Sequence, residues 1–207
     1  MTAENSIKSI INSTEIKLKE KGSTFIGIAY PLLTIEQIEE QLSHLHKKYY
    51  DSTHICYAYK LYPNTNKYSD DGEPNGTAGI RILNAILHFN LTNLLVVSIR
   101  YFGGTKLGVG LLGKTYYNSA FLTLENSNII EKIEYEKLIV SLDFNLTNIA
   151  HHIIKKFNCK IINTIVTEKQ TLELLIKSNL AEDFISNSIK VTNNQIEIIQ
   201  TNEKVFI

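Results

Sequence analysis

Apolar positions in the first fifty residues follow two periods, which predict two strands and a helix. Glu15–Glu20 and Thr24–Pro31 have the alternation and residue types of strands, and Lys21-Gly22-Ser23 between them is typical of a hairpin turn. Thr34 opens a predicted helix that ends near Tyr49. Apolar side chains share one face of this helix at Ile35, Ile38, Leu42 and Leu45.

The pattern in the middle of the chain predicts two further helices, with a buried strand between them in the sequence. His54–Tyr62 is rich in tyrosine and predicts a strand, whereas the polar composition of Pro63–Gly76 favours neither a strand nor a helix. Thr77–Phe89 predicts a helix that is apolar around most of its circumference. Asn93–Phe102 predicts a strand covered on both faces, and Leu111–Leu124 predicts a third helix.

The last third of the chain has the βαββαβ order of a ferredoxin-like domain. A boundary is expected near Asn126–Glu131. The strands are predicted at Tyr135–Asp143, Lys160–Thr167, Thr171–Ser178 and Gln195–Gln200, and the helices at Thr147–Phe157 and Ala181–Ile189. We therefore expect an α+β protein with domains at residues 1–131 and 132–207. No glycine follows Gly113, so the second domain is expected to be a structural or interaction platform without a phosphate loop.

Composition places the chain among ordinary globular proteins and narrows its partners. The 207 residues carry a formal net charge of zero, which argues against general attraction to nucleic acid or membrane but leaves a local basic patch open. Cys56 and Cys159 match no metal spacing and suit free thiols in a reducing cytoplasm. Glu4 and the lack of an apolar leader predict no signal peptide, and the apolar stretch Leu94–Ile99 is too short to span a membrane. A cytoplasmic protein is expected.

Special residues are concentrated in the segment from Tyr68 to Ala120. The only two arginines, Arg81 and Arg100, lie in it, as do eight of the ten glycines. Its stretch Gly108–Thr115 fits the pattern of a nucleotide-binding P-loop. A P-loop strand ends at the first glycine, but here the predicted strand ends near Phe102, so nucleotide binding is not favoured.

Two loops of this segment carry candidate chemistry. Asp70, Asp71 and Glu73, with His54, offer Mg²⁺ ligands or a general base, or else form a solvated turn beside a core histidine. Both interpretations stay open, and no defined metal site is predicted.

The second loop follows the predicted central strand. Arg100 and Lys106 flank Gly103-Gly104 just before a helix, where backbone N–H groups favour an anion. Tyr101 or Phe102 offers a ring for a nucleobase. The other interpretation is that both aromatics belong to the core, and for Phe102 the core is preferred.

Together the loops resemble the signature of the YigZ/IMPACT family of translation-associated proteins. The resemblance is carried by Asp70–Gly79 and Arg100–Gly108, with Thr53-His54 on the upstream strand, and extends from about Glu15 onward. It implies an N-terminal domain like the second domain of a small-subunit ribosomal protein and a C-terminal ferredoxin-like domain similar to one in elongation factor G. Arg81 departs from the family pattern, which usually has proline there.

The resemblance implies a non-catalytic binding protein whose partner is RNA, the ribosome or a translation-regulatory protein. Lys114 replaces the family's usual arginine and keeps its charge without the bidentate geometry. The expected anion-binding residues are Arg81, Arg100, Tyr101, Gly103, Gly104, Lys106 and Lys114. The alternatives are a hydrolase or transferase that uses Asp70, Asp71, Glu73 and His54 around a phosphate or Mg²⁺, and a protein-interaction module built on residues 132–207. No cofactor is expected, and the oligomeric state stays open.

Overall fold

The computed structural model describes residues 5–207, which form an α+β protein of two compact units. One unit is Lys8–Glu131, and the other is Lys132–Ile207 together with the segment that ends at Ile7. Within the second unit, the Glu134 N–H donates to the Asn5 carbonyl at 2.8 Å. Glu4, on which the absence of a signal peptide was argued, lies outside the described residues.

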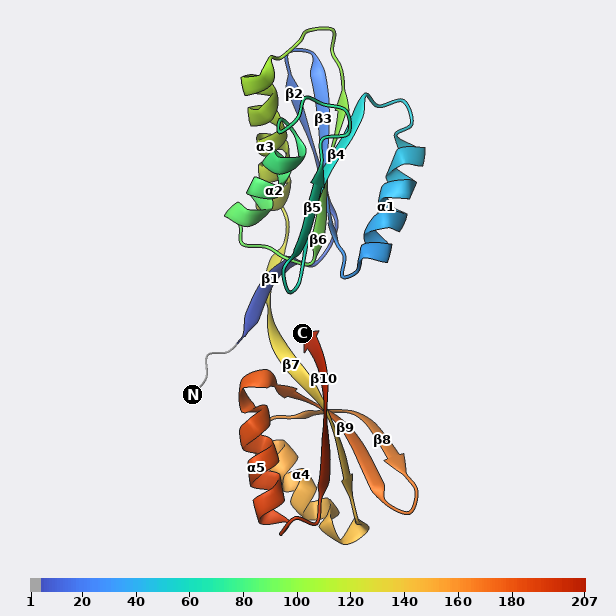
Figure 1. The fold of residues 1–207 in the computed structure, drawn as a ribbon, viewed down its shortest axis with the longest axis vertical. Coiled ribbons are helices and arrows are strands. Elements are labelled where there is room, and N and C mark those ends of the chain that lie inside the picture. Colours follow the sequence, from blue (N-terminus) through green and yellow to red (C-terminus); the bar gives the residue numbers. More distant parts are fainter. Residues whose placement is uncertain (1–4) are drawn as a thin grey trace. The chain divides into compact units, whose positions relative to one another are not determined.

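The N-terminal unit is an antiparallel five-stranded sheet in the order β2-β3-β6-β4-β5. Helix α1 covers one face, and α2 and α3 cover the other (Figure 1). The strands are β2 (Thr14–Glu20), β3 (Ser23–Pro31), β4 (His54–Leu61), β5 (Thr65–Ser69) and β6 (Leu94–Tyr101), and the helices are α1 (Ile35–Lys48), α2 (Gly79–His88) and α3 (Val109–Glu125).

Strand β6 lies at the centre of this unit because it is apolar on both faces. Leu94 and Val96 belong to the core under α2 and α3, whereas Leu95, Val97 and Ile99 belong to the core under α1. Its neighbours β3 and β4 both pair with it along nearly its whole length. The prediction of a strand covered on both faces is confirmed. The position of β6 between the two cores also sets the place where Arg100 and Tyr101, its last two residues, lie.

Two strands were missed from the sequence. The prediction that Pro63–Gly76 contains no regular strand is wrong, because β5 pairs antiparallel with β4 there. Most β5 side chains are exposed, because β5 is an edge strand. Such a strand lacks the alternation of apolar and polar residues from which strands are predicted. The short strand β1 (Ser6–Ile10) was also missed.

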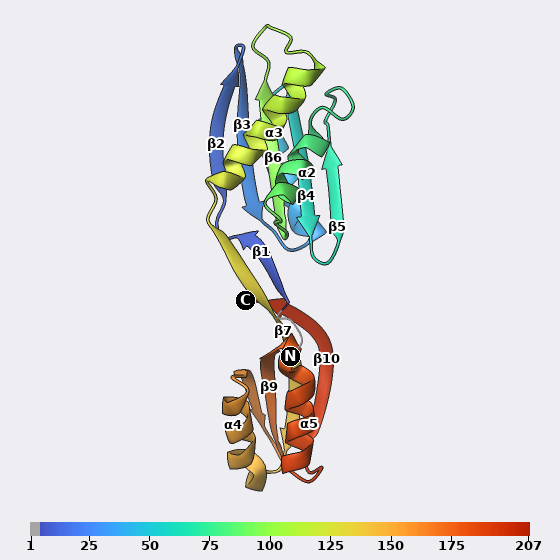
Figure 2. The same cartoon turned by 90° about the vertical axis from the view of Figure 1, so that its left-hand side faces the viewer.

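The C-terminal unit has the ferredoxin-like order β7-α4-β8-β9-α5-β10, as predicted. Its sheet runs β10-β7-β9-β8 with antiparallel neighbours, and β1 also lies beside β7. Both α-helices cover one face of this sheet (Figure 2). Leu138, Val140 and Leu142 point toward those helices because alternate residues of a strand share a face. The elements are β7 (Ile129–Leu142), α4 (Thr147–Lys156), β8 (Lys160–Val166), β9 (Gln170–Lys177), α5 (Ala181–Val191) and β10 (Glu197–Phe206), with 3₁₀ turns at Phe144–Leu146 and Ser178–Leu180.

Candidate functional site

The acidic loop before α2 is held by its own carboxylates. Asp70 accepts hydrogen bonds from the backbone N–H groups of Gly76, Ala78 and Gly79 at 2.8–2.9 Å, using both carboxylate oxygens. These donors lie at the start of α2, where helical N–H groups have no partner within the helix. Asp70 therefore caps α2, and its oxygens are occupied by the fold itself.

Asp71 fastens the same loop to strand β4. Its Oδ2 accepts the Ile55 N–H at 2.5 Å, and its carbonyl lies 2.6 Å from His54 Nδ1. A carbonyl can only accept, so Nδ1 carries the proton and Nε2 of a neutral His54 is left as an acceptor. A histidine fixed in this way has a defined tautomer, which suits either a structural or a chemical role.

Glu73 is the centre of a buried polar network. Its Oε1 accepts hydrogen bonds from Arg100 Nη1 at 2.6 Å and Tyr116 Oη at 2.8 Å, and its Oε2 lies 3.9 Å from His54 Nε2. Glu73 and Arg100 are only 8% and 6% exposed. Glu73, Arg100 and His54 were identified as candidates from the sequence. Tyr116 was missed, because nothing in the sequence distinguishes it from other tyrosines in helices.

Arg100 is committed to this network, so a phosphate contact by Arg100 would require the Glu73 pair to open. Its guanidinium lies over the ring of Phe25 at 5.5 Å and over that of Phe102 at 5.6 Å. Its Nε has no hydrogen-bond partner within residues 5–207, which fits a group placed between rings. Removing either charge of such a buried pair leaves the other uncompensated.

Phe102 was assigned to the core from the sequence, and that assignment is wrong. Its side chain is 47% exposed. The reason is that β6 ends at Tyr101, so Phe102 lies where the chain leaves the sheet. The apolar character of Phe102 does not show that the strand ends at Tyr101, one residue earlier.

Tyr101 and Arg100 face opposite sides of the sheet. Successive strand residues alternate, and Tyr101 packs against the α1 core, where its hydroxyl donates to Asp51 Oδ1 at 2.8 Å. Desolvation, with a further contribution from Asp51, raises the pKa of Tyr101 to about 12. The two residues predicted to share a site are therefore separated by the sheet itself.

The glycine loop after β6 is fixed by a close backbone contact. Gly103 packs on Gly22 of the β2–β3 turn with no room for a Cβ, and Gly104 has a φ of +85°. Lys106, in this loop, is exposed. The contact also brings the exposed Lys21 beside the loop, a cation that sequence reasoning missed because eighty residues separate the two turns.

Arg81 and Lys114 meet at a groove of about 420 Å³ between α2 and α3. Arg81 donates from Nε to the Gly76 carbonyl at 3.3 Å, and both cations are exposed. The remaining lining residues are Asn84, Val109, Gly110, Gly113 and Tyr117. The groove opens at the N-terminus of α3, whose first turn contains no acidic residue, so its positive end is not neutralised there.

Gly108–Thr115 does not form a P-loop. Strand β6 ends at Tyr101, and α3 already begins at Val109, so Lys114 and Thr115 lie inside a helix. The Thr115 hydroxyl donates to the Leu111 carbonyl at 2.8 Å. The similarity to the nucleotide-binding pattern is therefore one of sequence alone.

Neither cysteine has the properties of a nucleophile. Burial raises the pKa of the fully buried Cys56 thiol and raises that of Cys159 to about 12. Among residues 5–207, no three His, Cys, Asp or Glu side chains are grouped to hold a metal ion. Within the same residues, no helix is long and apolar enough to cross a membrane.

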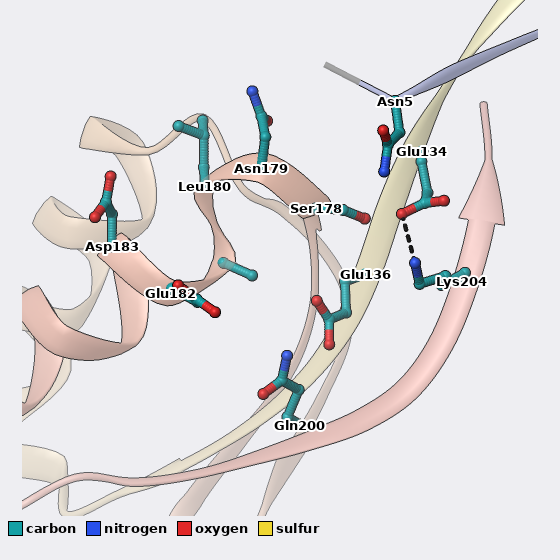
Figure 3. Close-up of a pocket in the computed structure, with 11 residues that line it drawn as sticks. Asn5, Glu134, Glu136, Ser178, Asn179, Leu180, Glu182, Asp183, Gln200 and Lys204 are labelled. Atoms are coloured by element: carbon teal, nitrogen blue, oxygen red, sulfur yellow. Dashed lines mark hydrogen bonds and ion pairs between the residues drawn. The ribbon is translucent and has the colours of Figure 1, made fainter. Parts of the chain in front are cut away.

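The C-terminal unit has a larger hollow of about 770 Å³ with the opposite electrostatic character (Figure 3). Glu134 there forms an ion pair with Lys204 at 2.9 Å, and Glu136 is only 7% exposed. Glu182 and Asp183 line the same hollow from the first turn of α5. Carboxylates repel phosphate, so an anionic partner is better matched by the N-terminal unit.

Comparison with known proteins agrees with the signature described above. A family model for the Impact N-terminal domain matches residues 21–124, half of the chain. The chain belongs to the IMPACT family. IMPACT family member YvyE of Bacillus subtilis (strain 168) is 26% identical over 178 residues, which cover 85% of this chain and 82% of the relative. The resemblance stated from the sequence is thereby confirmed.

Other similar proteins match either a part of this IMPACT chain or its fold. Protein IMPACT of Oryctolagus cuniculus is 35% identical over 98 residues, 45% of this chain and 31% of the relative. A solved structure titled "Crystal structure of an hypothetical protein" matches with a TM-score of 0.70 and 20% identity, and covers 96% of this chain and 98% of its own. That structure supports the fold of the chain.

Proposed function

We propose that this IMPACT family member is a translation-associated binding protein that contacts RNA, on or near the ribosome, through a basic surface of its N-terminal unit. The observation that carries the proposal is the groove between α2 and α3 that unites Arg81 and Lys114. Since the whole chain has no net charge, RNA contact depends on such a local patch.

The groove has four features that suit a phosphate. Two exposed cations line it, and the uncompensated N-terminus of α3 adds positive potential. Gly110 has open space around its Cα, so a phosphate can approach the backbone closely. Arg81 is partly oriented by the Gly76 carbonyl, which lowers the entropy lost when its guanidinium binds.

Two further exposed lysines of the N-terminal unit lie outside the groove. Lys106 lies on the loop that joins β6 to α3, and Lys21 lies on the turn that packs against that loop. An RNA backbone offers a series of phosphates, which suits cations distributed over a surface. A translation-related regulatory role also fits the IMPACT family as a group.

The enzymatic alternative has less support from the geometry. A hydrolase or transferase that used Asp70 and Asp71 with Mg²⁺ would need oxygens that now accept backbone N–H groups. Glu73 is likewise occupied by Arg100 and Tyr116. A screen of phosphate-containing substrates with and without Mg²⁺ tests this alternative, and activity lost in Asp71→Asn with the fold intact would favour it.

RNA binding is tested with a double variant of the groove. Arg81→Ala/Lys114→Ala should lower affinity for a labelled single-stranded RNA about tenfold or more at low salt, measured by fluorescence anisotropy. The slope of log affinity against log salt should flatten by about 0.7 for each removed phosphate contact. Ribosome co-sedimentation of the same proteins connects the RNA result to translation.

A matched control keeps the change of net charge equal. Lys155→Ala/Lys190→Ala removes two exposed cations from α4 and α5 of the other unit and should leave RNA affinity unchanged. No RNA binding by the wild type at low salt would contradict the function. Equal losses in the two double variants would contradict the site.

A further inference from the structure

We propose that Phe102 is a stacking platform for an unpaired nucleobase, with Lys21 and Lys106 beside it to meet the flanking phosphates. The inference rests on the RNA-binding function proposed above and specifies which form of RNA binds. It begins from the observation that a large aromatic side chain in the signature is 47% exposed. The ring follows the last residue of β6, so it is accessible to a ligand at the end of the central strand.

The backbone around this ring is fixed before any ligand arrives. The Phe102 N–H donates to Thr53 Oγ1 at 2.9 Å, and the Gly103 N–H donates to Ser23 Oγ at 3.1 Å. Gly103 also packs directly on Gly22, where no side chain would fit. The ring is therefore carried by a rigid segment, so that little conformational entropy is lost when a base binds.

One side of the ring is already covered, and the covering group is a cation. The Arg100 guanidinium lies over the Phe102 ring at 5.6 Å and over the Phe25 ring at 5.5 Å. Glu73 holds that guanidinium in place at 2.6 Å. A base on the open face of Phe102 would continue a ring–guanidinium–ring series into solvent, an arrangement that aromatic side chains and arginine favour with bases.

Two lysines supply the charge that an RNA backbone needs at this place. Lys106 follows Phe102 by four residues in the same loop, and Lys21 precedes the glycine that packs on Gly103. Both side chains are exposed. Bases within a duplex are stacked on both faces, so a platform of this kind selects single-stranded RNA or an unpaired loop.

The experiment compares a labelled single-stranded RNA of about twelve nucleotides with a duplex of the same sequence, by anisotropy on the full chain. The wild type should prefer the single strand. Phe102→Leu should lower single-strand affinity at least about fivefold, since stacking on one aromatic contributes roughly 1–3 kcal/mol. Phe102→Tyr keeps a ring and should retain most of the affinity.

The salt dependence separates stacking from charge. Phe102→Leu should leave the slope of log affinity against log salt unchanged, whereas Lys21→Ala/Lys106→Ala should flatten it. Equal single-strand and duplex affinity in the wild type, or equal affinity in Phe102→Leu and wild type, would overturn the platform while leaving RNA binding in place. No RNA binding at all by the wild type would overturn both proposals.

A second measurement covers the case in which Phe102→Leu disturbs the Arg100 network. Wild-type protein is photocrosslinked to RNA that contains 4-thiouridine, and the crosslinked residues are mapped by mass spectrometry. Crosslinks at Phe102 support the platform. Crosslinks confined to the groove at Arg81 and Lys114 would overturn it.

Discussion

The two units of this chain depend on different sequence features for their folds. The C-terminal unit contains no glycine. Its strands alternate apolar and polar residues, and helices cover one face of its sheet. The N-terminal unit covers both faces of its sheet and depends on close backbone approaches, such as that of Gly103 to Gly22. Alternation of apolar and polar residues can specify a sheet with one buried face. Close backbone contacts are needed where a loop must keep one conformation.

The units also use charge differently. The N-terminal unit buries both partners of the Glu73–Arg100 pair. In the C-terminal unit Lys137 and Glu173 are 23% and 22% exposed, and the buried Glu134 pairs with Lys204, which is 45% exposed. A buried pair costs desolvation and is retained where geometry matters, while an exposed pair is screened by water. Special residues therefore concentrate in the unit that carries the candidate site.

The largest expected difference between the units is in thiol reactivity. Cys56 lies in the N-terminal core with no exposed surface, so it should react with a disulfide reagent at least about a thousandfold more slowly than in the unfolded chain. Cys159 is only partly buried, so a reagent can reach it without unfolding of the unit, and it should react faster than Cys56. Two separate phases in a thiol titration at pH 8 are expected. A single phase would contradict the comparison.

Breaking the buried ion pair should have the next largest effect. Arg100→Ala leaves Glu73 as an unpaired buried carboxylate and should lower the free energy of unfolding by about 3–5 kcal/mol. Urea denaturation measures the change. A loss below 1 kcal/mol would mean that the network contributes no more than a surface pair.

The glycine contact gives a smaller effect with a built-in control. Gly103→Ala places a methyl group against the Gly22 backbone and should cost about 1–3 kcal/mol. Gly110→Ala meets open space inside α3 and should instead stabilise by up to about 1 kcal/mol, because alanine favours helix. Opposite shifts in melting temperature are expected, and shifts of the same sign would refute the packing argument.

The smallest effect is expected for the partly exposed Lys137–Glu173 pair of the C-terminal unit. Lys137→Ala removes a partner of Glu173 at 3.0 Å and should change stability by less than about 1 kcal/mol. The loss should fall further as salt is added. Denaturation in low and high salt checks this, and a cost equal to that of Arg100→Ala would erase the distinction between the units.

The sequence by itself determined which segments form most helices and strands, because the apolar period of each is local. The ferredoxin-like order followed from such periods in residues 132–207, and the central strand was recognised from its continuous apolar run. The family signature also identified the acidic and glycine loops. Strand β5 escaped because its polar edge carries no apolar period.

Only the tertiary structure decided what each signature residue faces. Arg100 and Arg81 were both predicted to bind an anion, yet one is buried against Glu73 and the other is exposed at a groove. Phe102 is exposed because its strand ends one residue earlier, and Lys21 joins the loop through a contact made eighty residues away. Exposure and partnership depend on which distant elements cover a side chain, and no local pattern records that.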